Sequence, residues 1–262
     1  MQIQSHSGNS PMLNVERRRY ILSTLNRQGK VLAHELSAAL NVSVDTIRRD
    51  LRELGDAGQL QRVHGGALPI LSTSTKFAVR LQDSSGAKVA IGKAAAQMIR
   101  NGQVVILDGG TTTLQVALNL PHSLRATIIT TALPVASALS EYENLDVFVV
   151  GGQLFRQSPV MVGAAAAKEI QSIRADICFL GVRSLHWEYG ASVAFREESD
   201  VKRAMVSSAA EVVALCTAEK LGTVSPYIIC PISELSSLIT EQSVSAETLE
   251  PYRTQGLTTI QV

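Results

Sequence analysis

Cysteine is scarce in this sequence, and its spacing excludes several kinds of site. The 262 residues include three cysteines, and no two have the Cys-x-x-Cys spacing of metal and disulfide-exchange sites. Each lies in an apolar run, which predicts buried thiols in a reducing compartment: Cys178, Cys216 and Cys230. We therefore expect no metal and no cofactor in this protein.

Long apolar segments are also missing. No run approaches the roughly 20 apolar residues of a membrane-spanning helix, and the polar first residues lack the apolar stretch of a signal peptide. The sequence thus predicts a cytoplasmic protein without a membrane partner. Residues 1–13 are rich in serine, glycine and asparagine, which predicts a disordered N-terminus.

Aromatic residues make up only 4% of the chain against 45% hydrophobic residues, so its cores must consist mainly of aliphatic side chains. The net charge of +1 is unevenly spread, because residues 1–70 hold nine Lys or Arg against six Asp or Glu. This moderate positive charge suits a domain that meets phosphate, although it is no polybasic tail. The length favours two domains.

Residues 43–54 have the pattern of a helix that reads DNA. Ser43 is suited to cap the helix, and Ile47, Leu51 and Leu54 repeat at helical spacing on one apolar face. Polar residues in the first turn and arginines one turn later are typical of side chains that reach bases and phosphates in the major groove. A solvated amphipathic helix with surface arginines has the same pattern, so this helix alone leaves both interpretations open.

The flanking segments favour DNA binding. Two helices are expected before this one, over residues 15–27 and 32–40, and a turn of only three residues follows the second, as in a helix-turn-helix unit. Residues 59–64 alternate like a strand and Gly65-Gly66 then turns the chain, which predicts a wing. The residues that we expect to contact DNA are Ser43, Val44, Asp45, Thr46, Arg48, Arg49, Arg52, Arg62 and His64, the last of which is equally suited to stabilise the turn.

Three stretches together resemble the N-terminal domain of DeoR-type bacterial transcription regulators. They are residues 35–43, the run Thr46-Ile47-Arg48-Arg49-Asp50-Leu51, and the run His64-Gly65-Gly66-Ala67. The similarity continues to about Thr240. It implies a winged helix-turn-helix domain joined to an effector-sensing domain related to sugar-phosphate isomerases. It therefore implies a regulator that binds specific DNA sequences. In this family the default is a repressor of a carbohydrate operon, and the ligand relieves the repression.

The winged helix-turn-helix domain is expected over residues 14–69, a polar linker over residues 70–87, and the sensor domain over residues 88–262. In the sensor domain, apolar strands alternate with helical segments, which is typical of a mostly parallel α/β sheet of the Rossmann type. The predicted strands are residues 104–107, 127–130, 147–150, 177–180, 212–215 and 227–230. Ligands of such sheets bind at the carboxyl ends of the strands.

The loop over residues 108–113, Asp-Gly-Gly-Thr-Thr-Thr, follows the first of these strands and opens a helix. Its glycines allow a close approach of the backbone, and the N–H groups at a helix start favour an anion. It matches neither common nucleotide-binding fingerprint. A plain strand-to-helix turn capped by threonine is the alternative. The resemblance favours a phosphate site, because related isomerases hold a substrate phosphate on the equivalent loop.

Other loops on the same edge of the sheet are expected to complete the effector site. Its expected residues are Asp108, Gly109, Gly110, Thr111, Thr112, Thr113, Thr130, Thr131, Gly151, Gly152, Arg156, Lys202 and Lys220. Arg156 is equally suited to be a surface charge, and Lys202 to pair with Glu198 on a solvated helix face. The chain departs from the family pattern at Thr131, where asparagine is common, and at Thr217, where an acid is common. These departures leave the sugar open.

Two functions are consistent with this pattern: a ligand-controlled transcription factor, or a sugar-phosphate isomerase that carries a DNA-binding domain. An isomerase needs carboxylates and a base placed to move protons on the sugar. The segment Gly181-Val182-Arg183 offers no acid, and Asp176 precedes its strand. We therefore expect binding without turnover and no catalytic residue. The expected partners are a double-stranded DNA operator, a phosphorylated sugar, and further copies of the chain in a dimer or tetramer, because paired modules bind repeated half-sites.

Overall fold

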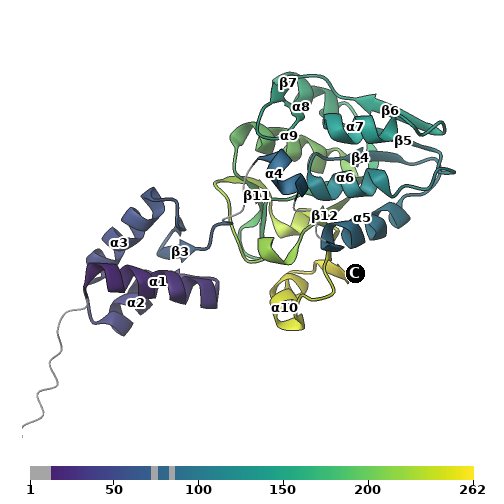
Figure 1. Ribbon diagram of the computed structural model, residues 1–262. Coiled ribbons are helices and arrows are strands. Elements are labelled where there is room, and N and C mark those ends of the chain that lie inside the picture. Colours follow the sequence, from purple (N-terminus) through teal and green to yellow (C-terminus); the bar gives the residue numbers. More distant parts are fainter. Residues whose placement is uncertain (1–12, 72–75, 83–85) are drawn as a thin grey trace, which may run out of the picture. The chain divides into compact units, whose positions relative to one another are not determined.

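The computed structural model describes residues 13–71, 76–82 and 86–262 (Figure 1). The chain divides into two units, residues 1–70 and residues 71–262, and each has its own hydrophobic core. The N-terminus predicted to be disordered is residues 1–13, of which residues 1–12 lie outside the described residues. Residues 72–75 and 83–85 of the predicted linker also lie outside them.

Three helices and a small antiparallel sheet make up the first unit. The helices are α1 (Asn14–Gln28), α2 (Ala33–Leu40) and α3 (Val44–Asp56), and the strands are β1 (Val31–Leu32), β2 (Gln61–Val63) and β3 (Gly66–Leu68), in the order β1-β3-β2. The apolar faces of the helices meet in a core that includes Ile21, Leu25, Leu36, Ile47 and Leu51. This arrangement confirms the predicted winged helix-turn-helix.

Short backbone motifs set the ends of these helices. α1 ends at Gly29, whose φ of 70° suits a glycine, and α2 ends at Asn41, which has a left-handed φ of 51°. The Ser37 hydroxyl donates to the Val42 carbonyl at 2.6 Å and fixes the turn between α2 and α3.

The wing depends on its two glycines. Gly65 has a φ of 78°, which L-amino acids with side chains rarely adopt. Gly66 lies so close to β1 that a Cβ atom on it would be 1.9 Å from the carbonyl oxygen of Val31. The Gly-Gly pair therefore serves both the turn and the pairing of β3 with β1.

Seven parallel strands form the main sheet of the second unit, in the order β15-β14-β12-β9-β4-β5-β6. They are β4 (Val104–Leu107), β5 (Ala126–Thr130), β6 (Leu145–Val149), β9 (Ala175–Gly181), β12 (Ala209–Leu215), β14 (Ser237–Thr240) and β15 (Thr258–Gln261). The chain adds β5 and β6 on one side of β4, and later adds β9 and its successors on the other side. The crevice between the carboxyl ends of β4 and β9 is thus the place where such sheets bind ligands.

Helices cover the sheet in two groups (Figure 1). α5 (Gly86–Met98), α6 (Thr111–Leu118) and α7 (Leu133–Leu139) form one group, and α8 (Ala164–Gln171) packs on α9 (Arg196–Ser207) in the other. The groups cover opposite faces because right-handed crossovers run one way along the sheet from β4 to β6 and the other way from β6 through β9 to β12. The remaining helices are α4 (Phe77–Gln82), which contacts α6, and α10 (Ala246–Thr254), which contacts β15.

Two smaller antiparallel sheets accompany the main one. One pairs β7 (Gln153–Phe155) with β8 (Val160–Val162), and the other has the order β10-β11-β13, from Ser184–His186, Gly190–Val193 and Tyr227–Cys230. The prediction that residues 227–230 join the parallel sheet was wrong, because β13 runs antiparallel to β11. An apolar run in the sequence indicates a buried strand but not the direction of its neighbour.

Part of the predicted linker is helical. α4 occupies residues 77–82, and α5 begins at Gly86.

The three cysteines are buried as predicted, and burial raises the pKa of the Cys216 and Cys230 thiols to about 12. Over the described ranges, no helix is both long enough and apolar enough to cross a membrane.

Candidate functional sites: a nucleic-acid face and an anion cavity

Helix α3 has an inner face and an outer face with different chemistry. Ile47, Leu51 and Leu54 are buried on the inner face, together with the carboxylate of Asp50. Four charged residues at positions i, i+3, i+4 and i+7 are exposed on the outer face: Asp45, Arg48, Arg49 and Arg52. This spacing puts the four side chains on one stripe of the helix. The outer face is therefore the candidate surface of α3 for contact with DNA.

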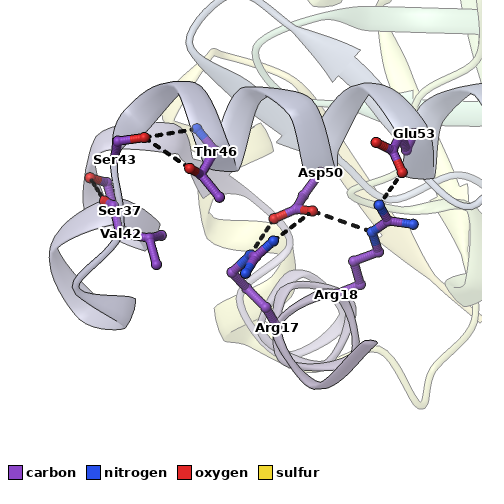
Figure 2. A network of polar contacts seen from close by, with 8 residues as sticks. All are labelled: Arg17, Arg18, Ser37, Val42, Ser43, Thr46, Asp50 and Glu53. Carbon is purple, nitrogen blue, oxygen red and sulfur yellow. Dashed lines mark hydrogen bonds and ion pairs between the residues drawn. The ribbon is translucent and has the colours of Figure 1, made fainter. Parts of the chain in front are cut away.

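Asp50 fixes α3 to α1 (Figure 2). It is 1% exposed, and its Oδ1 accepts from Arg17 Nη2 at 3.1 Å and from Arg18 Nε at 3.3 Å. Arg17 Nε donates to the other carboxylate oxygen, and Arg18 also pairs with Glu53. The hydrogen bond to Asp50 raises the pKa of Arg17. Sequence reasoning gave Asp50 no role, because nothing in the local pattern says which helix faces it.

The first turn of α3 is capped as predicted (Figure 2). Ser43 Oγ accepts from the Thr46 N–H at 3.1 Å and lies 2.9 Å from the Thr46 hydroxyl. Both hydroxyls therefore orient the helix start, and the half-buried Val44 packs against the core. Asp45 and Arg48 form an exposed ion pair at 3.1 Å, a kind that contributes little to stability.

Arg49 and Arg52 are the outer-face cations that remain available. Both are exposed, and neither takes part in an ion pair with another described residue. On the wing, Arg62 and His64 are exposed as expected. A Cβ atom on Gly55 would lie 3.1 Å from Cδ of Arg62, so the arginine stem lies against α3 at this glycine.

A cavity opens at the carboxyl ends of β4 and β9, where the strand order reverses. We call it the anion cavity, and it is lined by Arg80, Gly109, Gly110, Thr111, Thr112, Thr113, Gly181, Val182, Arg183, Val193, Ala194, Phe195, Glu198, Lys202 and Lys220. Seven of the thirteen residues expected at the effector site thus come together here. They are Gly109, Gly110, Thr111, Thr112, Thr113, Lys202 and Lys220.

Asp108 lies behind the cavity wall. It is 3% exposed, and its Oδ2 accepts from the Gly181 N–H at 2.8 Å and from Nζ of Lys202. The same ammonium donates to the Gly181 carbonyl at 2.8 Å. This buried pair ties β4, β9 and α9 together beneath the site. The i,i+4 spacing of Glu198 and Lys202 had suggested an ion pair between these two residues. Lys202 instead pairs with Asp108.

The start of α6 supplies hydrogen-bond donors to the cavity. The helix begins at Thr111, and its first N–H groups have no acceptor within the helix. The hydroxyl of Thr112 is buried without a hydrogen-bond partner among the described residues, whereas that of Thr113 donates to the Gly110 carbonyl at 3.0 Å. A Cβ atom on Gly109 would lie 2.1 Å from Cγ1 of Val160, so the loop needs this glycine.

Three further cations surround these donors. Burial lowers the pKa of Arg80 and of Arg183, and lowers the pKa of Lys220 to about 8. The charge of Arg80 lowers the pKa of both neighbours further. An adjoining cavity shares Arg80, Thr111, Arg183 and Lys220, and is completed by Leu71, Lys88 and Glu219. The combination of desolvated cations and a helix start is suited to a bound anion.

Glu198 is the carboxylate that lines the anion cavity. It is half-buried, and burial raises its pKa, while Lys202, Arg80 and Arg183 lower it in part. A carboxylate beside an anion site is suited to accept hydrogen bonds from ligand hydroxyls.

Across the described residues, no group of three His, Cys, Asp or Glu side chains is placed to hold a metal ion.

Five expected residues lie away from the anion cavity. Thr130 is buried, with its hydroxyl accepting from the Ala132 N–H at 3.1 Å, and Thr131 lines a second small cavity that shares Glu198 and Lys202 with the anion cavity. Gly151, Gly152 and Arg156 are exposed and follow β6, the strand at the edge of the sheet. Conversely, Arg80 was missed because it lies in the predicted linker. Arg183 and Glu198 were considered but not selected.

Comparison with known proteins covers both units. Residues 17–73 match the model of the DeoR-like helix-turn-helix domain, and residues 83–242 that of the DeoR C-terminal sensor domain. The chain is 32% identical to the transcriptional regulator GolR of Listeria innocua, over 94% of this chain and 98% of that protein. It is 34% identical to the regulator GlpR of Haloferax volcanii, over 95% and 98%. It is 33% identical to the repressor GlcR of Bacillus subtilis, over 88% and 90%.

The likeness to solved structures is weaker. Ribose 5-phosphate isomerase A from Methanocaldococcus jannaschii matches 51% of this chain and 52% of its own, at 17% identity and a TM-score of 0.37. This value is too low to bear on function.

Proposed function

This chain belongs to the DeoR family of transcriptional regulators, and we propose that it is a repressor whose operator affinity is controlled by a phosphorylated sugar. Its outer α3 face carries Arg49 and Arg52, and the wing adds Arg62 and His64. One relative of similar length is named a repressor. The proposed site of action is the cytoplasm of a prokaryotic cell, where the DNA lies.

The anion cavity carries the effector part of the proposal. It combines the start of α6, the buried Thr112 hydroxyl without a partner among the described residues, and the cations Arg80, Arg183 and Lys220. A phosphate placed at the helix start would accept from backbone N–H groups and neutralise desolvated cations. Coupling of about 1–3 kcal/mol between this site and the DNA site would change operator affinity roughly 5- to 150-fold.

Glu198 supports a sugar rather than a bare phosphate, and its substitution tests the assignment. Glu198→Gln should bind inorganic phosphate more tightly, because a like charge is removed from the cavity. The same variant should bind a phosphorylated sugar several-fold more weakly, because a neutral acceptor replaces a charged one. Glu197→Gln is the matched control, since Glu197 is exposed and does not line the cavity. Changes of the same sign for both ligands would contradict the role of Glu198.

The binding measurement itself uses thermal unfolding and titration calorimetry with phosphorylated sugars and their unphosphorylated parents. A ligand that binds the folded state raises the unfolding temperature. Stabilisation by phosphorylated members alone is the expected result. Stabilisation by the parents alone would refute the phosphate site, and would connect Thr131 and Thr217 to a different ligand.

The DNA part of the proposal is tested on a duplex selected from a random library by the purified protein. Arg49→Ala should weaken binding to this duplex. If the lost contact is to phosphate, the slope of affinity against salt falls by roughly 1; if it is to a base, discrimination at one position falls by about 1–3 kcal/mol. Arg100→Ala is the control, because Arg100 is exposed on the second unit. Equal affinity of both variants would refute the outer face of α3 as the DNA-reading surface.

An isomerase is the second candidate, and Glu198 is the observation that favours it. A half-buried carboxylate with a raised pKa beside an anion site resembles a general base. However, Asp108 is held by Lys202 and the Gly181 N–H, which leaves the cavity without a second free carboxylate among its lining residues. We therefore favour binding without turnover. Interconversion of ribose or fructose phosphates above background, lost in Glu198→Gln, would reverse this choice.

We further propose that the repressor is a homo-oligomer, because one short recognition helix gives limited affinity. The edge strand β6 supports this, since Phe148 is 61% exposed and Val149 is 47% exposed on it. Exposed apolar edge strands are ready surfaces for pairing with another copy. A monomer by light scattering at micromolar concentration that still binds the selected duplex tightly would contradict this proposal.

A further inference from the structure

The two cavities are lined in part by the segment that follows the DNA-binding unit. Leu71, the first residue of the second unit, lines the adjoining cavity, and Arg80 of α4 lines both cavities. Arg183 donates to the Leu71 carbonyl at 3.2 Å, and Lys88 donates to the Arg80 carbonyl at 3.1 Å. Both donors also line the adjoining cavity. The entry segment, residues 71 and 76–82, is therefore held by the same side chains that would meet a ligand.

Arg80 has a donor that no described residue satisfies. Its Nε atom is buried without a hydrogen-bond partner in the described part of the chain. Leaving a buried donor without an acceptor destabilises a protein, so such a group calls for an explanation. Arg80 lines the anion cavity; burial lowers its pKa, and the charges of Glu198 and Asp108 raise it in part. An oxygen of a bound anion would satisfy Nε.

We propose that Arg80 binds the anionic group of the effector, and that this contact ties α4 to the occupied cavity. The proposal rests on the phosphate site proposed above. A guanidinium presents a planar fork of N–H groups that matches two phosphate oxygens, which a lysine ammonium does not. An anion next to Arg80 and Arg183 also relieves the repulsion between these two cations. Arg80 would thus bind the anion and position the segment that follows the DNA-binding unit.

A purely structural role for Arg80 is the competing explanation. Its guanidinium lies 6.0 Å from the ring centroid of Phe77, and the charge of Glu198 attracts it. In that case Arg80 would hold α4 in place whether or not an anion is present. Substitution would then loosen α4 in the free protein, but adding an anion would leave the exchange of α4 amides unchanged.

Hydrogen–deuterium exchange of the full chain, with and without inorganic phosphate, separates these explanations. Phosphate should slow the exchange of backbone amides in α4 and at the start of α6 in the wild-type protein. In Arg80→Met, phosphate should bind about tenfold more weakly, and at saturation should protect α6 but not α4. Arg156→Met is the matched control, because Arg156 is exposed and lines neither cavity. It should behave as the wild type.

The outcomes also distinguish this proposal from the phosphate site on which it rests. If phosphate protects neither α6 nor α4 in the wild type, the phosphate site is wrong and the role of Arg80 falls with it. If phosphate protects α6 alone in the wild type, or protects α4 equally in Arg80→Met, only the role of Arg80 is refuted. Arg80→Lys keeps the charge and provides the same comparison if Arg80→Met does not fold; the loss of the planar fork should abolish most of the protection of α4.

Discussion

Replacing Asp50 with alanine should destabilise the first unit more than any substitution on the outer face of α3. The Asp50 side chain is 2% exposed, and its partners Arg17 and Arg18 are 12% and 28% exposed. Removing one partner of a buried ion pair costs about 3–5 kcal/mol. Because both arginines retain some contact with water, we expect the lower end, about 3 kcal/mol. A unit of this length has a free energy of unfolding on the order of 6 kcal/mol, so the loss is about half of it.

The chain offers a way to measure this unit separately. Trp187 is the single tryptophan and lies in the second unit, so its fluorescence follows that unit alone, whereas helical circular dichroism follows both. In urea, Asp50→Ala should move the dichroism transition of the first unit to lower concentration by about 3 M, for a slope of about 1 kcal/mol/M. The fluorescence transition should stay in place.

Two further variants make the reasoning refutable. Asp50→Asn keeps an acceptor but removes the charge, and should cost about 1–2 kcal/mol. Asp45→Ala breaks the exposed pair with Arg48, in which the Asp45 side chain is 83% exposed, and should cost less than about 0.5 kcal/mol. If Asp50→Ala were no less stable than Asp45→Ala, the Asp50 pair would not be what holds α3 on α1.

Two other predictions concern the anion cavity. Phosphate affinity should fall as the pH rises through about 8, because the ammonium of Lys220 attracts the anion and its pKa is lowered to about 8; titration calorimetry from pH 7 to 9 checks this, and Lys220→Gln should flatten the profile near pH 8. Gly109→Ala should destabilise the second unit by about 1–3 kcal/mol and weaken phosphate binding, because the new Cβ would lie 2.1 Å from Cγ1 of Val160. An unchanged fluorescence transition and phosphate affinity in Gly109→Ala would contradict the close approach of this loop to β8.

Local patterns predicted much of the fold because they depend on neighbours in sequence. Ser43 was expected to cap α3 and does so, since a cap needs only the next three residues. The strand over residues 104–107 was predicted with its observed bounds. The strand over residues 227–230 was assigned to the wrong sheet, because its partner β11 lies far away in the sequence.

The site depended on pairings that the sequence does not reveal. Lys202 and Asp108 are 94 residues apart, whereas the spacing of Lys202 and Glu198 suggested a pair that the structure does not form. Gly151, Gly152 and Arg156 were assigned to the site because they follow a strand. That strand is β6, which lies two strands away from β4 at the edge of the sheet. Strand order, on which the distance to the cavity depends, is a property of the assembled sheet.

The division of α3 into two faces has a consequence for how this protein can change over evolutionary time. The helix is held in its unit by the buried residues Ile47, Asp50 and Leu51. The exposed residues of the outer face contribute almost nothing to the stability of the unit: Asp45, Arg48, Arg49 and Arg52. If the outer stripe reads DNA as we propose, substitutions on it would alter the DNA sequence that is read and leave the fold intact. On that proposal, new operators would be acquired through single substitutions at these four positions, while the inner positions tolerate little variation.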